Sequence, residues 1–317
     1  GTKRRKDARK APGGDPEHFV AAAVGGSIAA QEGVFGFDAK DLGPQKVRLV
    51  LANTEEPINY EIAVAGDLGV RTFADLKGKR VAWYVNYPVV NVNTEAYLAY
   101  GGLTWDDVER VEVKGFFDAA LKALADGELD AAFAATIGSG ASAADAGPRD
   151  LFWPPVDPSD REAMARMAAV APYFVPHVDD EGPGIEPGTD QHGAHYPYPI
   201  LVTMAATSDD LVTNMVKAMV ELFPQYKGKV LGIDGWEIDE QELLWFVPYH
   251  AGAVDYFKEA GLWTDRAQAN NDRLIARQDA LADAWTALKA ENPDNWKDAW
   301  AARRAQALKD GGFQPLF

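Results

Sequence analysis

The sequence predicts an α/β protein with mixed, mainly parallel sheets, because short apolar strands alternate with helices along its first half. Three segments are expected to form strands, of which the first and last are buried: Val81–Val85, Val111–Val113 and Leu129–Ala135. Helices are expected between them at Glu95–Tyr100 and Asp118–Ala125. Strands and helices that alternate at this spacing are typical of βαβ units.

Apolar segments on either side of this region extend the pattern. Val47–Ala52, Tyr60–Ala65 and Ile200–Ala205 are predicted strands, and a turn at Gly25–Ser27 is expected to precede a short helix over residues 28–37. A helix is predicted at Asp209–Phe223, with Leu211, Met215, Met219 and Leu222 on its apolar face. The C-terminal third is predicted to be helical, with one stripe of Leu274, Leu281, Trp285 and Leu288 and another of Trp296, Trp300 and Leu308.

Length and charge limit the classes of function. A chain of 317 residues is long enough for two domains or one large one. Acidic residues outnumber basic ones 48 to 31, so a net charge of −17 argues against nucleic acid or an anionic membrane as the main partner. There are no cysteines, which excludes disulfides, thiolate metal sites and cysteine nucleophiles.

The N-terminal segment, residues 1–16, is rich in Lys and Arg and reads as a loose arm. No apolar run follows it, so it does not have the pattern of a signal peptide. We therefore expect that a signal was removed or that the sequence begins inside a domain. No apolar run approaches the about 18 residues needed to span a membrane.

The first candidate site is the segment Asn86–Thr94, which follows a predicted strand and is expected to be a polar loop that opens a helix near Thr94. Its amides and hydroxyl, beside free N–H groups of a helix, suit a carboxylate or a polyhydroxy ligand. An ordinary strand-to-helix loop is the alternative. Trp83 and the nearby tyrosines offer rings for a ligand, although a core role is the default for Trp83.

The second candidate is the loop from Thr136 to Ser142, which follows the strand Leu129–Ala135. Its glycines permit close approach of a ligand and its hydroxyls offer contacts. It matches neither the Walker loop nor the dinucleotide fingerprint, so no nucleotide cofactor is expected. A flexible connection is an equally good interpretation.

The histidines and acidic residues give only weak evidence for a metal site or for catalytic residues. His192 and His195 would need a helix to share a metal, and the neighbouring Gly and Pro argue against one. His177 lies near Asp179 in the sequence, so a binding site for a divalent cation is an open alternative there. No nucleophile motif is present, and we predict no catalytic residue, no metal and no cofactor.

Seven segments carry a resemblance to a known family. They are GGSIAAQEGVFGF (25–37), GPQKVRLVLAN (43–53), GVRTFADLKGKRVAW (69–83), GLTWDDV (102–108), ALADGELDAAFAA (123–135), YPYPILV (196–202) and YHAGAVDYFKEAGLW (249–263). In this order they resemble the TAXI family of solute receptors that serve TRAP transporters. Single blocks are shared more loosely with other periplasmic binding proteins.

The resemblance implies a two-lobed, type II periplasmic-binding-protein fold with a helical C-terminal extension. One lobe would comprise residues 1–72 and 203–317 and the other 73–202, with hinges near 69–72 and 199–203. It also implies a monomeric periplasmic receptor that closes over one small organic acid and delivers it to TRAP permease subunits driven by an ion gradient.

The resemblance places site residues unevenly. The family's segment after the DLKGKR strand is matched well only at Thr94, so the ligand is expected to be unusual. The turn at Ser27 and the strand end at Thr136 fall where cleft residues lie, and a first strand and helix are expected before residue 1. The predicted ligand-binding residues are Ser27, Trp83, Asn86, Asn91, Asn93, Thr94, Thr136 and Tyr198.

Two other functions stay open at this point. One is a protein of the same fold that presents its ligand to a sensor kinase. The other is an enzyme with this fold, which would need a pair of titrating groups in the cleft. Arg4, Arg5 and Arg80 are the possible counter-charges for an acid, although Arg80 begins a strand and is expected to face solvent.

Overall fold

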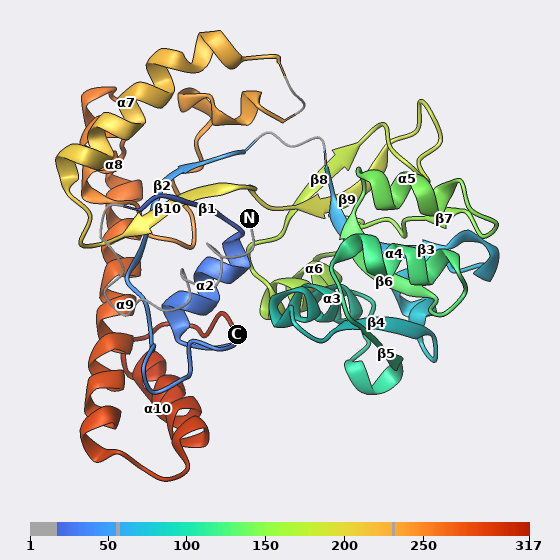
Figure 1. Ribbon diagram of the computed structural model, residues 1–317, viewed down its shortest axis with the longest axis horizontal. Coiled ribbons are helices and arrows are strands. Elements are labelled where there is room, and N and C mark those ends of the chain that lie inside the picture. The colour runs from blue at the N-terminus through green and yellow to red at the C-terminus, as the bar shows by residue number, and fades with distance from the viewer. Residues whose placement is uncertain (1–17, 55–57, 230–231) are drawn as a thin grey trace. The chain divides into compact units, whose positions relative to one another are not determined.

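The computed structural model describes residues 18–54, 58–229 and 232–317. Contacts divide the chain into two compact units, which Figure 1 shows. The first unit comprises Gly1–Glu56 and Pro197–Leu316, and the second comprises Pro57–Tyr196 with Phe317. The predicted basic arm, with Arg4 and Arg5, lies outside the described residues.

The second unit contains a five-stranded sheet of order β5-β4-β6-β3-β7. Its strands are β3 (Tyr60–Ala65), β4 (Arg80–Tyr84), β5 (Glu109–Val113), β6 (Ala131–Ala135) and β7 (Leu151–Phe152). β4 pairs in parallel with β5 and β6, whereas β3 is antiparallel to β6 and β7. The α/β class with mixed sheets is therefore confirmed.

Helices pack in pairs around this sheet. They are α3 (Pro88–Tyr100), α4 (Phe117–Ala125), α5 (Ser139–Asp145) and α6 (Arg161–Val170). α3 packs with α6 and α4 packs with α5 (Figure 1). A separate hairpin of β8 (Val175–Asp179) and β9 (Gln191–His195) packs against β3.

The predicted polar loop Asn86–Thr94 is largely helical, which corrects the sequence prediction. α3 begins at Pro88, a residue favoured at the first helical position because its fixed φ suits the helix and its missing N–H is not needed there. The predicted turn Gly25–Ser27 is likewise inside a helix, α2 (Val24–Glu32), which ends at Gly33 in the left-handed conformation.

The sheet of the first unit has three strands, β1 (Val20–Ala22), β2 (Val47–Ala52) and β10 (Ile200–Met204), in the order β1-β10-β2. Both ladders are antiparallel, unlike the mainly parallel lobe expected. β2 is buried along its whole length, which fits a sequence that is apolar except for Arg48. The predicted boundaries at 72/73 and 202/203 are offset from the observed divisions, because β3 belongs to the five-stranded sheet.

Four helices complete the first unit: α7 (Asp209–Tyr226), α8 (Ala251–Glu259), α9 (Asp265–Glu291) and α10 (Trp296–Asp310). α7 buries Val212, Val216 and Phe223, so its buried face is rotated from the predicted one: Leu211, Met215 and Met219 are half-buried and Leu222 is exposed. α9 and α10 form a helical hairpin (Figure 1) around a core of Leu281, Trp285, Leu288, Trp296, Trp300 and Leu308. That core confirms the two stripes predicted from the sequence, except for half-buried Leu274.

A buried carboxylate joins these helices to α2. Glu32 is fully buried and pairs with Arg277 of α9 and Arg304 of α10. Its Oε1 also accepts a 2.7 Å hydrogen bond from the backbone N–H of Leu316. Because burial disfavours the charged form, the pKa of Arg277 falls to about 10, helped by the nearby Arg273.

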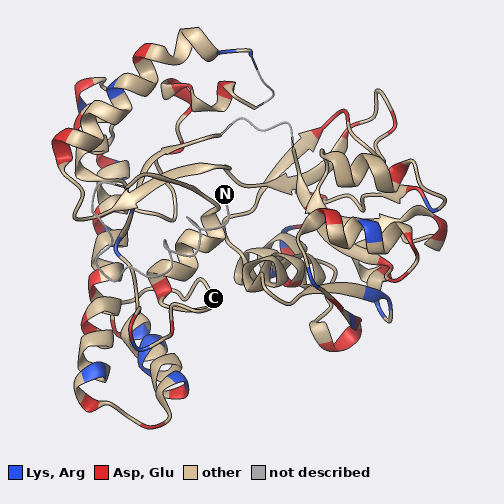
Figure 2. Ribbon diagram, in the orientation of Figure 1, with Lys and Arg blue, Asp and Glu red and all other residues tan. Residues whose placement is uncertain are grey.

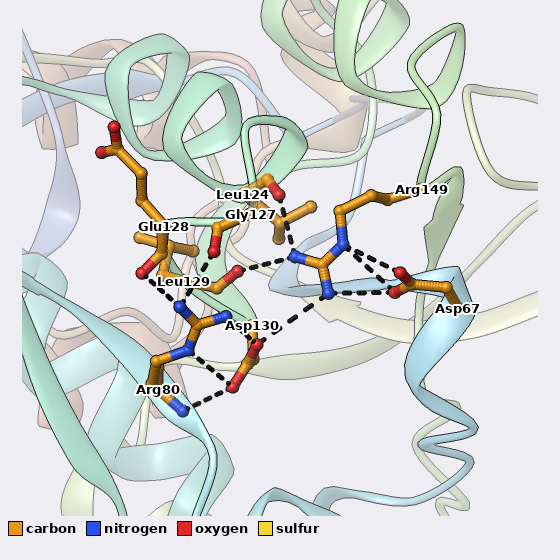
Figure 3. Close-up of polar contacts among 8 residues, drawn as sticks. All are labelled: Asp67, Arg80, Leu124, Gly127, Glu128, Leu129, Asp130 and Arg149. Atoms are coloured by element: carbon orange, nitrogen blue, oxygen red, sulfur yellow. Dashed lines mark hydrogen bonds and ion pairs between the residues drawn. The ribbon is translucent and has the colours of Figure 1, made fainter.

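A second ion-pair cluster lies at the amino end of β4, as Figure 3 shows. Arg80 donates through Nη2 and Nε to Asp130, at 2.6 and 3.2 Å, and through Nη1 to the carbonyls of Gly127 and Glu128. Burial opposes ionisation of Asp130, but hydrogen bonds from Arg80 outweigh it and lower the pKa of the carboxyl. The side chain of Arg80 is 35% exposed, in keeping with the expectation, but its guanidinium is held by Asp130 and by the carbonyls of a loop.

Replacing Asp130 with alanine is expected to lower the free energy of unfolding by about 2 kcal/mol, since charge-assisted hydrogen bonds are lost and Arg80 keeps no counter-ion. Urea unfolding followed by circular dichroism measures this. Lys77→Ala is the control, because its 3.4 Å ion pair is largely exposed and should leave the midpoint unchanged. Equal midpoints for the Asp130 variant and the wild type would contradict the assignment.

Acidic residues are spread along helices and loops of both units (Figure 2). Among the described helices, none combines the length and apolar character that crossing a membrane requires.

Candidate functional site

Three parallel strands of the second unit end at one edge of its sheet. Because β5, β4 and β6 run in the same direction, the loops that follow them meet there, joined by the amino end of antiparallel β3. We call this the carboxyl edge and define it by residues 85–87, 114–116, 136–138 and 58–60. Open α/β sheets bind small ligands at this edge.

Exposed side chains are concentrated on the first two of these loops. Asn86 and Tyr87 follow β4, and Lys114 and Phe116 follow β5; all four are exposed. The rings of Tyr87 and Phe116 contact each other, with centroids 4.9 Å apart. The backbone N–H of Val85 donates to the carbonyl of Val113 at 3.3 Å, which holds the two loops side by side.

Asn91 and Thr94 are committed to local hydrogen bonds. The amide of Asn91 accepts from the N–H of Tyr84 at 2.8 Å and donates to the carbonyl of the same residue at 3.0 Å. Thr94 donates to the carbonyl of Val90 one turn earlier, at 2.9 Å. Both side chains are buried; Asn91 fixes α3 to the end of β4, and Thr94 bonds within α3.

Asn93 faces an aromatic layer beneath the edge. Its Oδ1 accepts a 2.6 Å hydrogen bond from the hydroxyl of Tyr173, and its amide lies 3.5 Å from the hydroxyl of Tyr196. Tyr196 stacks on Tyr60 with ring centroids 4.7 Å apart. Burial raises the pKa of Tyr173, so its hydroxyl is a neutral donor.

Thr136 ties the hairpin to the carboxyl edge. Its hydroxyl donates to Oδ2 of Asp179 at 2.7 Å and accepts from the N–H of Asn59 at 3.0 Å. The same Asp179 oxygen accepts the N–H of Asn59 at 2.8 Å. One buried carboxylate therefore fastens β8 to the ends of both β3 and β6.

Two histidines stack beside this carboxylate. The rings of His177 and His195 are 4.2 Å apart and nearly parallel. Burial, with a smaller contribution from His177, lowers the pKa of His195 to about 4, so its ring is neutral at physiological pH. Nδ1 of His177 lies 3.0 Å from Oδ1 of Asn59, an acceptor, and 3.5 Å from Oδ1 of Asp179.

The histidines do not form a metal centre with their neighbours. His192 and His195 lie on β9 at positions three apart, which places them on opposite faces of a strand. Within residues 18–54, 58–229 and 232–317, no group of three or more His, Asp or Glu side chains is arranged to hold a metal ion.

Glu61 is the most unusual group in the cluster. It is fully buried on β3, and neither carboxyl oxygen makes a hydrogen bond of good geometry among the described residues, although the nearby amides of Asn59 and Gln191 oppose the rise of its pKa. Burial, followed by the charge of Asp179, raises the pKa of Glu61 well above its ordinary value. Gly193 of β9 permits this packing, since a Cβ there would lie 2.7 Å from Oε1 of Glu61 and 2.4 Å from Nδ2 of Asn59.

Of the remaining predicted residues, Trp83 lies within β4, whereas Ser27 and Tyr198 belong to the first unit. Trp83 packs edge-on against Trp105, 4.9 Å away, with the guanidinium of Arg110 over its ring. Ser27 is a buried residue of α2 that donates to the carbonyl of Ala23. Tyr198 is 39% exposed and precedes a cis proline in the first unit.

A surface groove of about 660 Å³ lies between α4 and α5 of the second unit. Its lining residues are Asp118, Lys122, Ala125, Asp126, Ser139, Gly140, Ala143, Ala144, Gly147 and Pro148. The groove is shallow and contains an internal ion pair between Lys122 and Asp126, so we assign no function to it.

Comparison with known proteins identifies the family. A family model described as the NMT1-like family matches residues 20–261. The chain belongs to the NMT1-like family. No curated protein matches this NMT1-like chain.

Solved structures give weaker likenesses. The alkanesulfonate-binding protein SsuA from Xanthomonas axonopodis pv. citri, bound to MOPS, shares 15% identity over 73% of this chain and 59% of its own, with a TM-score of 0.30. A glutathione-bound periplasmic binding protein from Brucella ovis shares 12% identity over 86% and 64%, with a TM-score of 0.33. SsuA from Escherichia coli shares 15% over 74% and 68%, with a TM-score of 0.28. We transfer none of these ligands to the NMT1-like chain.

Proposed function

We propose that this chain is an extracytoplasmic solute receptor that binds a small organic acid and delivers it to a membrane permease. The observation that carries the proposal is the carboxyl edge, where three parallel strands end beside exposed Asn86, Tyr87, Lys114 and Phe116. Membership in the NMT1-like family and the resemblance to TAXI receptors support the same reading.

The titratable groups near this edge favour binding over catalysis. A general acid or base must lie within hydrogen-bond reach of the reacting group. Glu61 is fully buried, Asp179 is 3% exposed, and Asp179 is occupied by Thr136 and Asn59. Asp179 therefore holds the hairpin in place, and burial closes both carboxyl groups to a solute.

An acid suits the edge because its local charge differs from that of the whole chain. Lys114 and the amide of Asn86 are exposed on adjacent loops. The N-terminal end of α3 meets the same loops, has no acidic residue in its first turn and adds positive potential, whereas Asp118 offsets that of α4. Each of these features favours a carboxylate over a neutral or cationic solute.

We assign the partner to the TRAP class, on the resemblance to TAXI receptors. A monomeric receptor in the periplasm would load such a permease, and uptake would follow an ion gradient. Transport measured in proteoliposomes with candidate permeases tests the class. Uptake that needs ATP and ignores the ion gradient would point to an ABC transporter instead.

The first test of binding is a thermal-shift screen of carboxylates, amino acids and sugars. A carboxylate at a hundredfold excess over its Kd should stabilise the chain by about 2.7 kcal/mol. Asn86→Ala should then weaken that ligand about tenfold, or about 1.4 kcal/mol. Calorimetric titration of both proteins measures the difference.

Asn214→Ala, an exposed asparagine of α7, is the matched control and should bind like the wild type. Asn93→Ala and Thr94→Ala are poorer probes, because both side chains are buried in internal hydrogen bonds. If no solute class stabilises the chain, the receptor proposal fails.

A further inference from the structure

The carboxyl edge is unusually apolar. Ten large apolar side chains are exposed among the described residues, and three of them lie on the two loops after β4 and β5. Val85 is 43% exposed, Tyr87 39% and Phe116 46%. Scattered single apolar residues on a surface need no explanation, whereas a contiguous group at a predicted ligand site does.

The two exposed rings rest on a fixed support. Phe116 stacks on Phe117 with centroids 4.0 Å apart and planes 21° apart. Phe117 meets the ring of Tyr84 edge-on at 6.4 Å, and Tyr84 is fully buried. Tyr87 and Phe116 are thus the outer members of a row of rings that is anchored in the core.

Local folding does not explain why these positions are aromatic. Tyr87 and Phe116 occupy the positions immediately before α3 and α4, where Ser, Thr, Asp and Asn are favoured because they accept a backbone hydrogen bond. Neither ring makes such a bond. Each exposes apolar surface to water, which is unfavourable unless something covers it.

We propose that Tyr87 and Phe116 select the solute, and that it is an aromatic monocarboxylic acid. This inference rests on the proposed receptor function and narrows its ligand. The ring of the acid packs on the row formed by Tyr87 and Phe116, and Lys114 and Asn86 supply the polar rim for the carboxylate.

Charge and solvation favour this class over a dicarboxylate. Aromatic rings in offset or edge-on contact attract one another beyond the gain from burial alone. A second carboxylate on the solute would lose water against Phe116 without gaining a partner there. Lys114, two residues before Phe116, matches a single negative charge beside an apolar body.

Calorimetric titration of the full chain with benzoate, phenylacetate, succinate and glutamate tests the inference. We expect the aromatic acids to bind and the dicarboxylates to bind at least tenfold more weakly. Phe116→Ala should weaken the aromatic acids at least tenfold, whereas Phe116→Tyr, which keeps the ring, should stay within about twofold. Tyr87→Ala provides a second variant. Leu222→Ala, equally exposed on α7, should change nothing.

The outcomes separate this inference from the receptor function. Binding of succinate or glutamate without aromatic acids would overturn the aromatic assignment and leave the receptor standing. Equal binding of aromatic acids to the wild type and to both alanine variants would also overturn it. If none of the four probes binds while another carboxylate does, the aromatic assignment is again wrong, and if no solute binds, both proposals fail.

Discussion

Replacing Glu32 with alanine is expected to lower the free energy of unfolding by about 3–5 kcal/mol. The substitution leaves Arg277 and Arg304 without their counter-charge in an interior where their side chains are only 6% and 14% exposed. It also removes the acceptor for the N–H of Leu316. Urea unfolding followed by tryptophan fluorescence measures the loss, since Trp285 and Trp300 lie in the adjoining helical hairpin.

The matched control for this prediction is Glu291→Ala. Glu291 pairs with Arg303, as Glu32 does with its arginines, but its side chain is 55% exposed, so its loss should cost no more than about 1 kcal/mol. A triple variant with Met at 32 and Leu at 277 and 304 should recover much of the stability, because it removes all three buried charges. A Glu32→Ala protein as stable as the control would show that the buried cluster contributes little.

Replacing Glu61 with glutamine is expected to stabilise the protein at about pH 8 and to change little at about pH 4. The pKa of Glu61 is raised in the folded state by burial and then by Asp179, from an ordinary value of 4.5. Between 4.5 and the raised value, the folded chain holds a proton that the unfolded chain releases. Stability therefore falls as pH rises through this window, by up to about 1.4 kcal/mol per pH unit.

Glutamine keeps the shape of the protonated acid and cannot ionise, so the variant should escape this loss. The groups that face Glu61 are Asp179 and, through the same cluster, His177, His195 and Tyr97. Glu128→Gln, at an exposed position of the same unit, should follow the wild type at every pH. Parallel pH curves for Glu61→Gln and the wild type would contradict the assignment of a buried proton.

The strands were predictable because their cause is local. Val47–Ala52 and Tyr60–Ala65 are unbroken or nearly unbroken apolar runs, and they match β2 and β3 at both ends. The aromatic stripes of α9 and α10 were predictable for the same reason, since helical spacing places their residues on one face. The antiparallel pairing of strands in the first unit was not predictable, because it depends on partner strands that are distant in the sequence.

The start of α3 was not predicted because its residues favour two different local structures. Asparagines and a threonine after a strand indicate a loop, since their side chains compete for backbone groups. In the structure those side chains do bond to backbone, but to Tyr84 outside the helix and Val90 within it. Pro88 at the first helical position was the signal that favoured a helix.

The hydrogen-bonded group beneath the carboxyl edge could not be predicted from the sequence. Asn59, Thr136 and Asp179 are joined by hydrogen bonds across 77 and 120 positions, and no spacing pattern announces such contacts. Thr136 was predicted from its place at a strand end, whereas Glu61 looked like one polar residue in an apolar strand. A charged residue within an otherwise buried strand was the one available signal.

The double hydrogen bond between Asn91 and Tyr84 makes the length of the connecting turn invariant. An inserted residue between β4 and α3 would advance the helix by about 100° and carry the amide away from the strand. The same rotation would withdraw the hydroxyl of Tyr97 from the carbonyl of Tyr60, which it reaches at 2.8 Å. Relatives that retain this asparagine should therefore keep the number of residues between β4 and α3, even where a different solute changes the identity of residues 85–87.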